Sequence, residues 1–343
     1  MGGCFMDVYE TINSKSSEVA HKIYEHYREI DPRYRNDTFK EKTIQDAKYN
    51  LSYLATAIKY KEPAIFADYI DWFKQLAEGY SLNFDMFKDS LRYMAEISTD
   101  FYSKDVAEFI KKYIVDSLEM YKQMEETEFS HKYENQYKKY KEALLSTDKA
   151  KAWDSINELI ENKVEIEDIY IHIFARSQYE IGQLWQKNKI SVAQEHYATA
   201  VTQSLMSNLY AKIVSFKPGG NTLVAVGTSG ELHEIGIRMV ADFFEMRGWN
   251  SVFFGSNTPS ESVIHFIERN DVDLLAIGAT LPPHLVEMQR LVDLVRQTRH
   301  DLPIIVGGKA ISGNIDLAKK LGADATAFSA KDAVRKGEEI VSR

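Results

Sequence analysis

Residues 222–236 read TLVAVGTSGELHEIG, and this stretch decides the fold of the last third of the chain. It opens with the apolar run Thr222–Val226, which predicts a buried strand. An amphipathic run follows from Ile235 and predicts a helix. His233 therefore lies on a loop at the carboxyl end of a strand, two residues after Glu231. It is either an ordinary surface histidine or a metal ligand.

The same strand-then-helix pattern recurs through the rest of this region. Short apolar runs alternate with amphipathic runs, which predicts β/α units around a parallel, Rossmann-like sheet. A sheet of this kind binds ligands outside the carboxyl ends of its strands. The expected strands are Thr222–Gly227, Ser251–Gly255, Leu274–Gly278, Pro303–Gly307 and Ala325–Phe328.

The first two-thirds of the chain reads as helical. Between Lys61 and Phe216 the only proline is Pro63, and apolar residues recur three and four apart. We expect a multi-domain α plus α/β protein. Its parts are a helical sensor or partner-binding domain over 1–125, a charged helical linker over 126–147, a four-helix bundle over 148–217 and the sheet domain over 218–343.

The charged segment 104–147 predicts one long helix or a helix pair. A solvated connector is one interpretation, and a helix that transmits strain or mediates dimerisation is the other. Pro218-Gly219-Gly220 marks the break before the first strand.

Aromatic residues are dense in the N-terminal region. They indicate either a helical core or a pocket for a planar ligand. The histidines of this region, His21 and His26, lie near its start, which argues against a haem held by a proximal histidine in a late helix. The aromatic residues in question are Tyr69, Trp72, Phe73, Tyr80, Phe84, Phe87 and Tyr93.

Composition sets broad limits on function. The 343 residues are 44% hydrophobic and 27% charged, with a net charge of −9, which is typical of a globular protein without a basic face for nucleic acid. One cysteine, Cys4, excludes a disulfide within the chain. No apolar run of membrane-spanning length and no secretory signal is evident. We therefore expect a cytoplasmic protein that binds neither nucleic acid nor membrane.

Three loop motifs line up at the expected strand ends: ExHxxG over Glu231–Gly236, GATLPP over Gly278–Pro283, and the pair Gly307-Gly308. Together they resemble the cobalamin-binding fold, whose signature is DxHxxG, then SxL, then GG. In that family the histidine replaces the corrinoid's own base as the lower cobalt ligand. The resemblance implies this role for His233 and a groove for the released nucleotide tail along the SxL and GG loops.

Simple chemistry agrees with these roles. A neutral imidazole is a good ligand for a transition metal, and a carboxylate on its other nitrogen, here Glu231, fixes the tautomer. Glycines at 307 and 308 leave room for a bulky ligand, and Gly236 lets the helix start pack on the sheet. The implied cofactor contacts of this domain are Glu231, Leu232, Gly236, Gly278, Thr280, Leu281, Gly307 and Gly308.

Two departures from the family pattern concern this domain. Glu231 stands for the usual aspartate, and Gly278 and Thr280 stand for the serine and leucine of SxL. The serine hydroxyl that contacts the tail is therefore missing, and Thr280 is the expected substitute.

A second pattern lies in the expected bundle. Trp185 is followed nine residues later by Glu195-His196. This Wx9EH pattern resembles the bundle of B12-dependent photoreceptors of the CarH and LitR type, where tryptophan and glutamate surround the upper axial group. The resemblance implies that Trp185 and Glu195, with His196 beside them, cover an alkylcobalamin. Adenosylcobalamin is the expected form and methylcobalamin the alternative. The competing interpretation is a core tryptophan and an ordinary helix start.

The chain also departs from the CarH and LitR photoreceptors in two respects. We find no MerR-type DNA-binding segment, and Gln186 replaces the histidine that captures cobalt after photolysis in CarH. His196 or water would have to substitute. The N-terminal region faintly resembles non-haem globin-like sensor domains, which are joined to B12 domains in photocobilins. A bilin is the implied second chromophore, although no residue identifies it.

The leading hypothesis is a light sensor, in which Co–C photolysis shifts the bundle and signals to a protein partner or through homo-oligomer assembly. The alternatives are a corrinoid protein that carries methyl groups between methyltransferases, and a cobalamin sensor or store without photochemistry. We find no nucleophile–base pair in the sequence that would make the chain a catalyst by itself.

Overall fold

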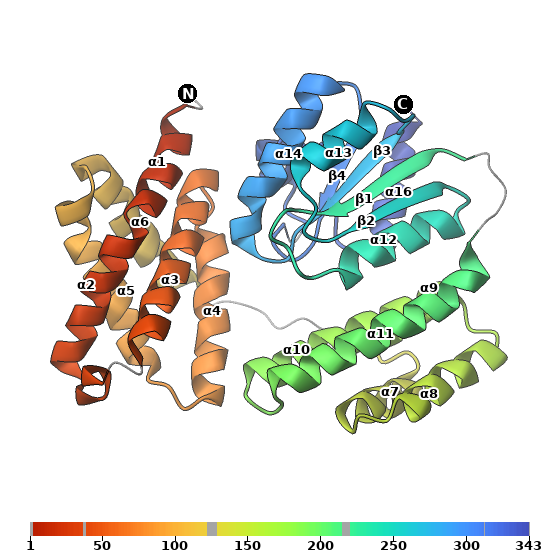
Figure 1. Cartoon of the computed structure of the whole chain (residues 1–343), viewed down its shortest axis with the longest axis horizontal. Helices are drawn as coiled ribbons and strands as arrows, with labels where there is room; N and C mark the ends of the chain where they lie inside the picture. The colour runs from red at the N-terminus through yellow and green to blue at the C-terminus, as the bar shows by residue number, and fades with distance from the viewer. Residues whose placement is uncertain (1–2, 37–38, 122–128, 215–219, 312, 343) are drawn as a thin grey trace. The chain divides into compact units, whose positions relative to one another are not determined.

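The computed structural model describes residues 3–36, 39–121, 129–214, 220–311 and 313–342. The chain forms two compact units, Met1–Glu126 and Thr127–Arg343, and each is described by itself below. The first is helical, and the second combines helices with a sheet (Figure 1).

The N-terminal unit is built from helices throughout its described residues. Pro63 occupies the first turn of α4, where its missing N–H costs nothing, and the Asn83 side chain caps α5 by accepting from the Met86 amide at 3.2 Å. The elements are α1 (Gly3–Ser14), α2 (Ser16–Ile30), η1 (Pro32–Arg35), α3 (Lys40–Tyr60), α4 (Pro63–Gly79), α5 (Phe84–Phe101) and α6 (Lys104–Met120).

Aromatic rings of this unit pack mainly on one another. Tyr69 stacks on Tyr53 with ring centroids 4.1 Å apart, and Phe73 stacks on Phe87 at 3.9 Å. The buried Tyr69 hydroxyl donates to the Asn50 side chain at 2.7 Å. This packing favours the helical-core interpretation of the aromatic cluster. The bilin stays a prediction.

The second unit begins with a helical bundle. Residues 166–186 form α9, a six-residue π-helical segment and α10 in direct succession. Ser191 and Gln194 form a capping box at the start of the next helix. The elements are α7 (Glu134–Leu145), α8 (Lys149–Glu161), α9 (Ile166–Ile169), η4 (Tyr170–Ala175), α10 (Arg176–Gln186) and α11 (Val192–Ile213).

The structure corrects the predicted linker. Helix α7 belongs to the bundle core, because Tyr137 and Tyr140 are fully buried and the Tyr140 hydroxyl hydrogen-bonds with that of Thr202 in α11 at 2.8 Å. Helix α6 belongs to the N-terminal unit. Lysines and glutamates on the outer face of α7 match the pattern expected of a solvated connector, whereas tyrosines form its buried face.

Sheet residues of the second unit form five parallel strands within the described part of the chain, in the order β2-β1-β3-β4-β5 (Figure 1). Each strand lies within one residue of its predicted bounds. They are β1 (Thr222–Gly227), β2 (Asn250–Gly255), β3 (Leu274–Gly278), β4 (Ile304–Gly307) and β5 (Ala325–Ala327). The predicted Rossmann-like architecture is confirmed.

Register aligns the strand ends that matter for function. Gly227 pairs with Gly278, Gly278 with Gly307, and Gly307 with Ala327, so the loops that follow β1, β3 and β4 leave the sheet side by side. The chain order reverses between β1 and β3, which is where open α/β sheets bind ligands. The intervening helices are α12 (Ile235–Met246), α13 (Ser260–Ile267), η5 (Pro282–His284), α14 (Leu285–Thr298), α15 (Ile315–Lys320) and α16 (Ala330–Val341).

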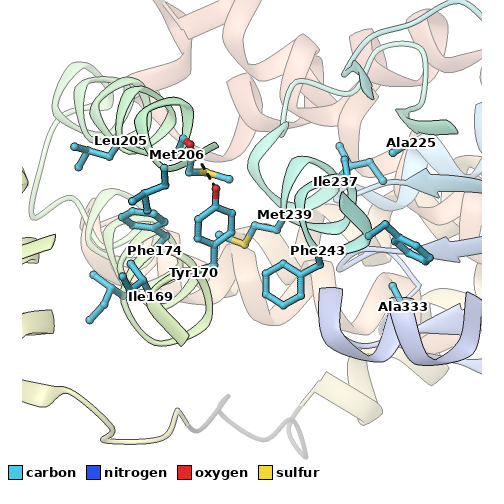
Figure 2. Close-up of a cluster of buried hydrophobic side chains, with 14 of the residues drawn as sticks. Ile169, Tyr170, Phe174, Leu205, Met206, Ala225, Ile237, Met239, Phe243 and Ala333 are labelled. Atoms are coloured by element: carbon cyan, nitrogen blue, oxygen red, sulfur yellow. Dashed lines mark hydrogen bonds between the residues drawn. The ribbon is translucent and has the colours of Figure 1, made fainter. Parts of the chain in front are cut away.

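One hydrophobic core joins the bundle to the sheet domain. Figure 2 shows Tyr170 and Phe174 of the bundle facing Met239 and Phe243 of α12. The rings of Tyr170 and Phe243 lie 6.0 Å apart. Burial of these side chains holds the bundle against α12, the helix that follows the His233 loop.

Two further observations complete the fold. The break predicted at Pro218-Gly219 lies outside the described residues. Among the helices that the structure describes, none combines the length and apolar character needed to cross a membrane.

Candidate functional site

Glu231 is the centre of the candidate site. Its side chain is 1% exposed, and its carboxylate accepts hydrogen bonds from two loops, its own loop after β1 and the segment after β3. The His233 ring donates from Nδ1 at 2.5 Å and the His233 amide at 2.9 Å. On the other oxygen, the Thr280 amide donates at 2.6 Å and His284 from Nδ1 at 3.1 Å. A buried carboxylate with four donors is fully satisfied.

The charge state of Glu231 follows from these contacts. Burial by itself raises the pKa of this carboxyl, but hydrogen bonds from His233, His284 and the Thr280 amide outweigh it and hold the pKa well below its usual range. Glu231 is therefore a carboxylate at neutral pH. Because a carboxylate only accepts, both imidazoles must present Nδ1–H to it.

This arrangement prepares His233 as a ligand. With the proton on Nδ1, the lone pair lies on Nε2, which is the nitrogen that can bind a metal. The His233 side chain is 55% exposed, so its outer part is accessible from solvent. The predicted pairing of Glu231 with His233 is thus present, and the extra methylene of glutamate does not prevent it.

His284 is the member of this cluster that sequence reasoning missed. It lies at the end of η5, directly after the GATLPP motif, and the prediction stopped at Pro283. Its side chain is mostly buried. The available signal was its position: a histidine just past the second loop motif, at the same edge of the sheet as His233.

The second loop has a physical reason for its departures from SxL. A methyl group on Gly278 would lie 3.2 Å from Ile237 of α12, so glycine allows this helix to pack closely on β3. Thr280 contributes its backbone amide, which binds Glu231. Leu281 after β3 and Leu232 after β1 leave apolar side chains exposed at this edge.

In the third loop, Gly308 is required for packing between protein loops, which is not the reason that the sequence predicted. Gly308 has φ +98°, and a methyl group there would lie 2.2 Å from the carbonyl oxygen of Ala279. The Ala310 amide donates to the same oxygen at 3.2 Å. Gly308 is therefore required first for the close approach of two protein loops, and Gly307 is less constrained.

Gly236 needs a similar correction. A methyl group on it would meet no atom within 4 Å, so packing of α12 on the sheet does not require glycine there. Its predicted contact with a cofactor stays a prediction, and the open space beside it is compatible with one.

The bundle residues form a separate group. Trp185 is partly buried near the end of α10, and Glu195 lies in the first turn of α11. Glu195 binds Nδ1 of His196 at 2.6 Å and accepts from the Thr199 hydroxyl at 3.0 Å. His196 is 73% exposed, whereas Gln186 is 7% exposed. Among the described residues, no hydrogen bond or ion pair joins this group to Glu231 or His233.

The residues of the sheet edge fit a corrinoid. They offer one exposed imidazole backed by a buried carboxylate, small residues where backbones converge, and exposed apolar side chains that a large ring can cover. Comparison with known families agrees. A B12 binding domain model matches residues 221–336, and a second B12 binding domain model matches residues 136–210.

This chain is a cobalamin-binding protein.

Corrinoid proteins of methanogens are among the relatives of this cobalamin-binding protein. Dimethylamine corrinoid protein 3 of Methanosarcina acetivorans is 23% identical over 203 residues, which cover 58% of this chain and 94% of the relative. The trimethylamine corrinoid protein of Methanosarcina barkeri is 24% identical over 203 residues, covering 58% and 93%. The structure of the Methanosarcina barkeri monomethylamine corrinoid protein is similar with a TM-score of 0.54 at 20% identity, covering 60% of this chain and 99% of that one, which shows a shared fold.

These findings confirm the cobalamin prediction and support the corrinoid-protein alternative better than the photoreceptor hypothesis. Both family models lie beyond residue 135, so they leave the N-terminal unit unmatched.

Proposed function

We propose that the chain is a corrinoid protein that carries a methyl group between partner methyltransferases. The observation that carries the proposal is the Glu231–His233 pair at the sheet edge, in a chain whose second unit is similar to methylamine corrinoid proteins over nearly their full length. When bound, the corrinoid supplies a cobalt centre that accepts a methyl cation equivalent and releases it again, the bonding electron pair staying on cobalt.

The chain's own residues hold and orient this centre. His233 would hold the cobalt through Nε2, and Glu231 fixes the ring by accepting from Nδ1. Glu231 is itself held by the Thr280 amide and the His284 ring, so the ligand is supported from a second loop. Leu232 and Leu281 contribute apolar surface for the corrin.

The bundle would cover the other face of the bound corrinoid. Trp185, Glu195 and His196 lie at neighbouring ends of α10 and α11, and the polar side chains are accessible there. In a methyl carrier this region must open to the partner's substrate, and the exposed His196 side chain is compatible with access from solvent.

A light sensor is the second candidate, and one observation favours it. The Trp185 and Glu195-His196 pattern of the photoreceptors is present in the bundle, and the chain adds an N-terminal helical unit that the family models do not cover. Such a unit is a natural place for signal output or for a second chromophore.

The test starts with the lower ligand. The full chain is loaded with hydroxocobalamin, reduced to the Co(II) form and examined by electron paramagnetic resonance. The protein is labelled with ¹⁵N, because the cofactor's own ¹⁴N base also splits the signal of Co(II). A ¹⁵N doublet from a protein imidazole is expected in the wild type and in the control His300→Ala, an exposed histidine. It should disappear in His233→Ala, which leaves either no splitting or the ¹⁴N triplet of the cofactor's own base. A ¹⁵N doublet that survives His233→Ala, or its absence from the wild type, would overturn the assignment.

The second step separates carrier from sensor. The loaded chain is reduced to Co(I), and its methylation by methyl iodide is followed by absorbance beside free cobalamin. A separate sample of the chain, loaded directly with methylcobalamin, is compared in darkness and green light by size-exclusion chromatography. Methylation at a rate comparable to that of free cobalamin, with unchanged elution in light, supports the carrier. Protection from methylation together with light-dependent elution supports the sensor instead.

A further inference from the structure

Phe328 is an exposed aromatic side chain at the sheet edge that the loop motifs do not include. It directly follows β5 and is 72% exposed. Its neighbour Ala327 pairs with Gly307, so Phe328 stands beside Gly308 at the next position of the adjacent strands. Single exposed apolar residues are common on proteins, so exposure alone indicates nothing.

What distinguishes Phe328 is that its ring is held in place while remaining exposed. A methyl group on Gly313 would lie 1.8 Å from Cε1 of the ring, so Phe328 rests on a glycine whose φ is +68°. The ammonium of Lys336, a residue of α16, lies 5.2 Å from the centroid of the Phe328 ring. The Phe328 amide donates to Asp332 at 3.2 Å, which also holds Lys336 at 2.9 Å.

These contacts fix the ring on its inner side and leave the rest open next to the Gly307-Gly308 turn. Stacking on a planar heterocycle suits a ring fixed in this way, because little side-chain entropy is lost on binding. A nucleotide base is such a heterocycle, and base–aromatic stacking contributes substantially to affinity.

We propose that Phe328 is a specificity-determining residue that stacks against the base of the cobalamin nucleotide tail. The inference rests on the proposed lower-ligand role of His233, because the base is free to reach this edge only after an imidazole has taken its place on cobalt. Lys336 and Gly313 act as positioning residues for the ring.

The experiment compares two ligands that differ in the tail. Hydroxocobalamin carries the nucleotide, and diaquocobinamide lacks it. Dissociation constants of both are measured by quenching of intrinsic fluorescence for the wild type, Phe328→Ala and Phe328→Trp. The control is Ile30→Ala, an exposed apolar residue of the N-terminal unit. Circular dichroism and thermal unfolding check that each variant is folded.

We expect Phe328→Ala to weaken cobalamin binding about 10-fold and leave cobinamide binding unchanged. Phe328→Trp should restore cobalamin affinity, and Ile30→Ala should have no effect. Equal losses for both ligands would show contact with the corrin and overturn the tail assignment. No loss of affinity for either ligand would overturn the proposal altogether.

Failure of the lower-ligand proposal gives a different result. In that case the bound wild-type cobalamin keeps its own base on cobalt, so the ¹⁵N-labelled protein shows the ¹⁴N triplet of that base, and His233→Ala leaves the triplet unchanged. The stacking role of Phe328 is judged only from the difference between its effects on the dissociation constants of the two ligands.

Discussion

The Tyr170 hydroxyl, in the π-helical segment of the bundle, donates to the Asp242 carboxylate of α12 at 2.9 Å. Both residues are buried, and Asp242 is 4% exposed. Arg238, one turn earlier on α12, donates to the Ser207 hydroxyl of α11 at 3.0 Å. Since α12 begins two residues after His233, these bonds connect the candidate ligand loop to the bundle through one rigid helix.

Because the Asp242 carboxyl is buried, we expect an unusual dependence of the free energy of unfolding on pH. Burial raises the pKa of its carboxyl to about 6 from an ordinary 3.8, although the Tyr170 hydrogen bond and Arg238 lower it in part. The folded-state pKa is thus above the unfolded-state value. The protonated carboxyl stabilises the fold below pH 4, and this stabilisation of roughly 3 kcal/mol is lost as the pH rises through 6.

Asp242→Asn should abolish this pH dependence. The amide keeps an acceptor for Tyr170 and carries no charge, so the variant should equal or exceed the wild type in free energy of unfolding at pH 7, by about 1–3 kcal/mol. Urea unfolding at pH 4, 5, 6 and 7 measures the effect. The matched control is Asp332→Asn, because ion pairs with Lys336 and Arg335 lower the pKa of Asp332. Asp332→Asn should lower the free energy of unfolding at pH 7. Parallel pH profiles for Asp242→Asn and the wild type would contradict the prediction for Asp242.

Tyr170→Phe should destabilise the second unit. It leaves the buried Asp242 carboxylate without its closest donor, which costs about 1–3 kcal/mol at neutral pH. A double-mutant cycle with Asp242→Asn isolates the bond, since the loss on Tyr170→Phe should shrink when the acceptor is already neutral. Equal losses in both backgrounds would mean that the hydroxyl acts elsewhere, for instance on the Met206 carbonyl at 3.5 Å.

Glu231→Gln should weaken cobalamin binding by about 10- to 100-fold, as for other carboxylates that support a metal-ligating histidine. The amide nitrogen of glutamine would face an N–H donor where the carboxylate oxygen of Glu231 accepts a hydrogen bond, so one hydrogen bond becomes a repulsion. His284→Ala should cause a smaller loss, because the Thr280 amide and both His233 donors still hold Glu231. His284→Asn should recover part of it.

Cobalamin titration followed by absorbance measures these affinities. Glu261→Gln is the control, since Glu261 is an exposed residue of α13 that pairs with Arg290. A wild-type affinity in Glu231→Gln would show that the carboxylate does not orient the ligand.

Two glycine substitutions separate folding from binding. Gly308→Ala forces a methyl group against the Ala279 carbonyl at positive φ and should cost at least ~2 kcal/mol of stability. Gly236→Ala meets no atom within 4 Å and lies in the first turn of α12, where alanine is a better helix former. It should leave thermal unfolding unchanged and lower cobalamin affinity, because the predicted cofactor contact fills the open space. Unchanged affinity would remove Gly236 from the site.

Local patterns were sufficient to predict most of this fold. Apolar runs placed the strands because a parallel sheet is buried on both faces, and the ExHxxG spacing placed His233 beside Glu231 because both lie on one short loop. What local patterns could not supply was pairing across the chain. His284 meets Glu231 only because β1 and β3 are neighbours, and the same pairing explains Gly278 through its contact with Ile237.

The linker error has a related cause. The charge pattern of α7 describes its solvent face, and its buried face depends on a partner helix that follows far along the sequence. The Tyr140–Thr202 contact spans that separation. Tyrosine also gave an ambiguous signal, since it suits both a core and an exposed helix.

Gln186→His tests whether the bundle can capture cobalt as in the photoreceptors that it resembles. Gln186 is 7% exposed, so a histidine there should remain directed into the bundle, and photolysis of bound adenosylcobalamin should give no bis-histidine spectrum. His196 is 73% exposed beside Glu195, which makes it the side chain able to reach outward. If any imidazole is captured, the photoproduct of His196→Ala should therefore revert to the aquo form, while Gln186→His should match the wild type. A bis-histidine spectrum that appears only in Gln186→His would show that α10 turns its buried face toward the cofactor, and would favour the sensor over the carrier.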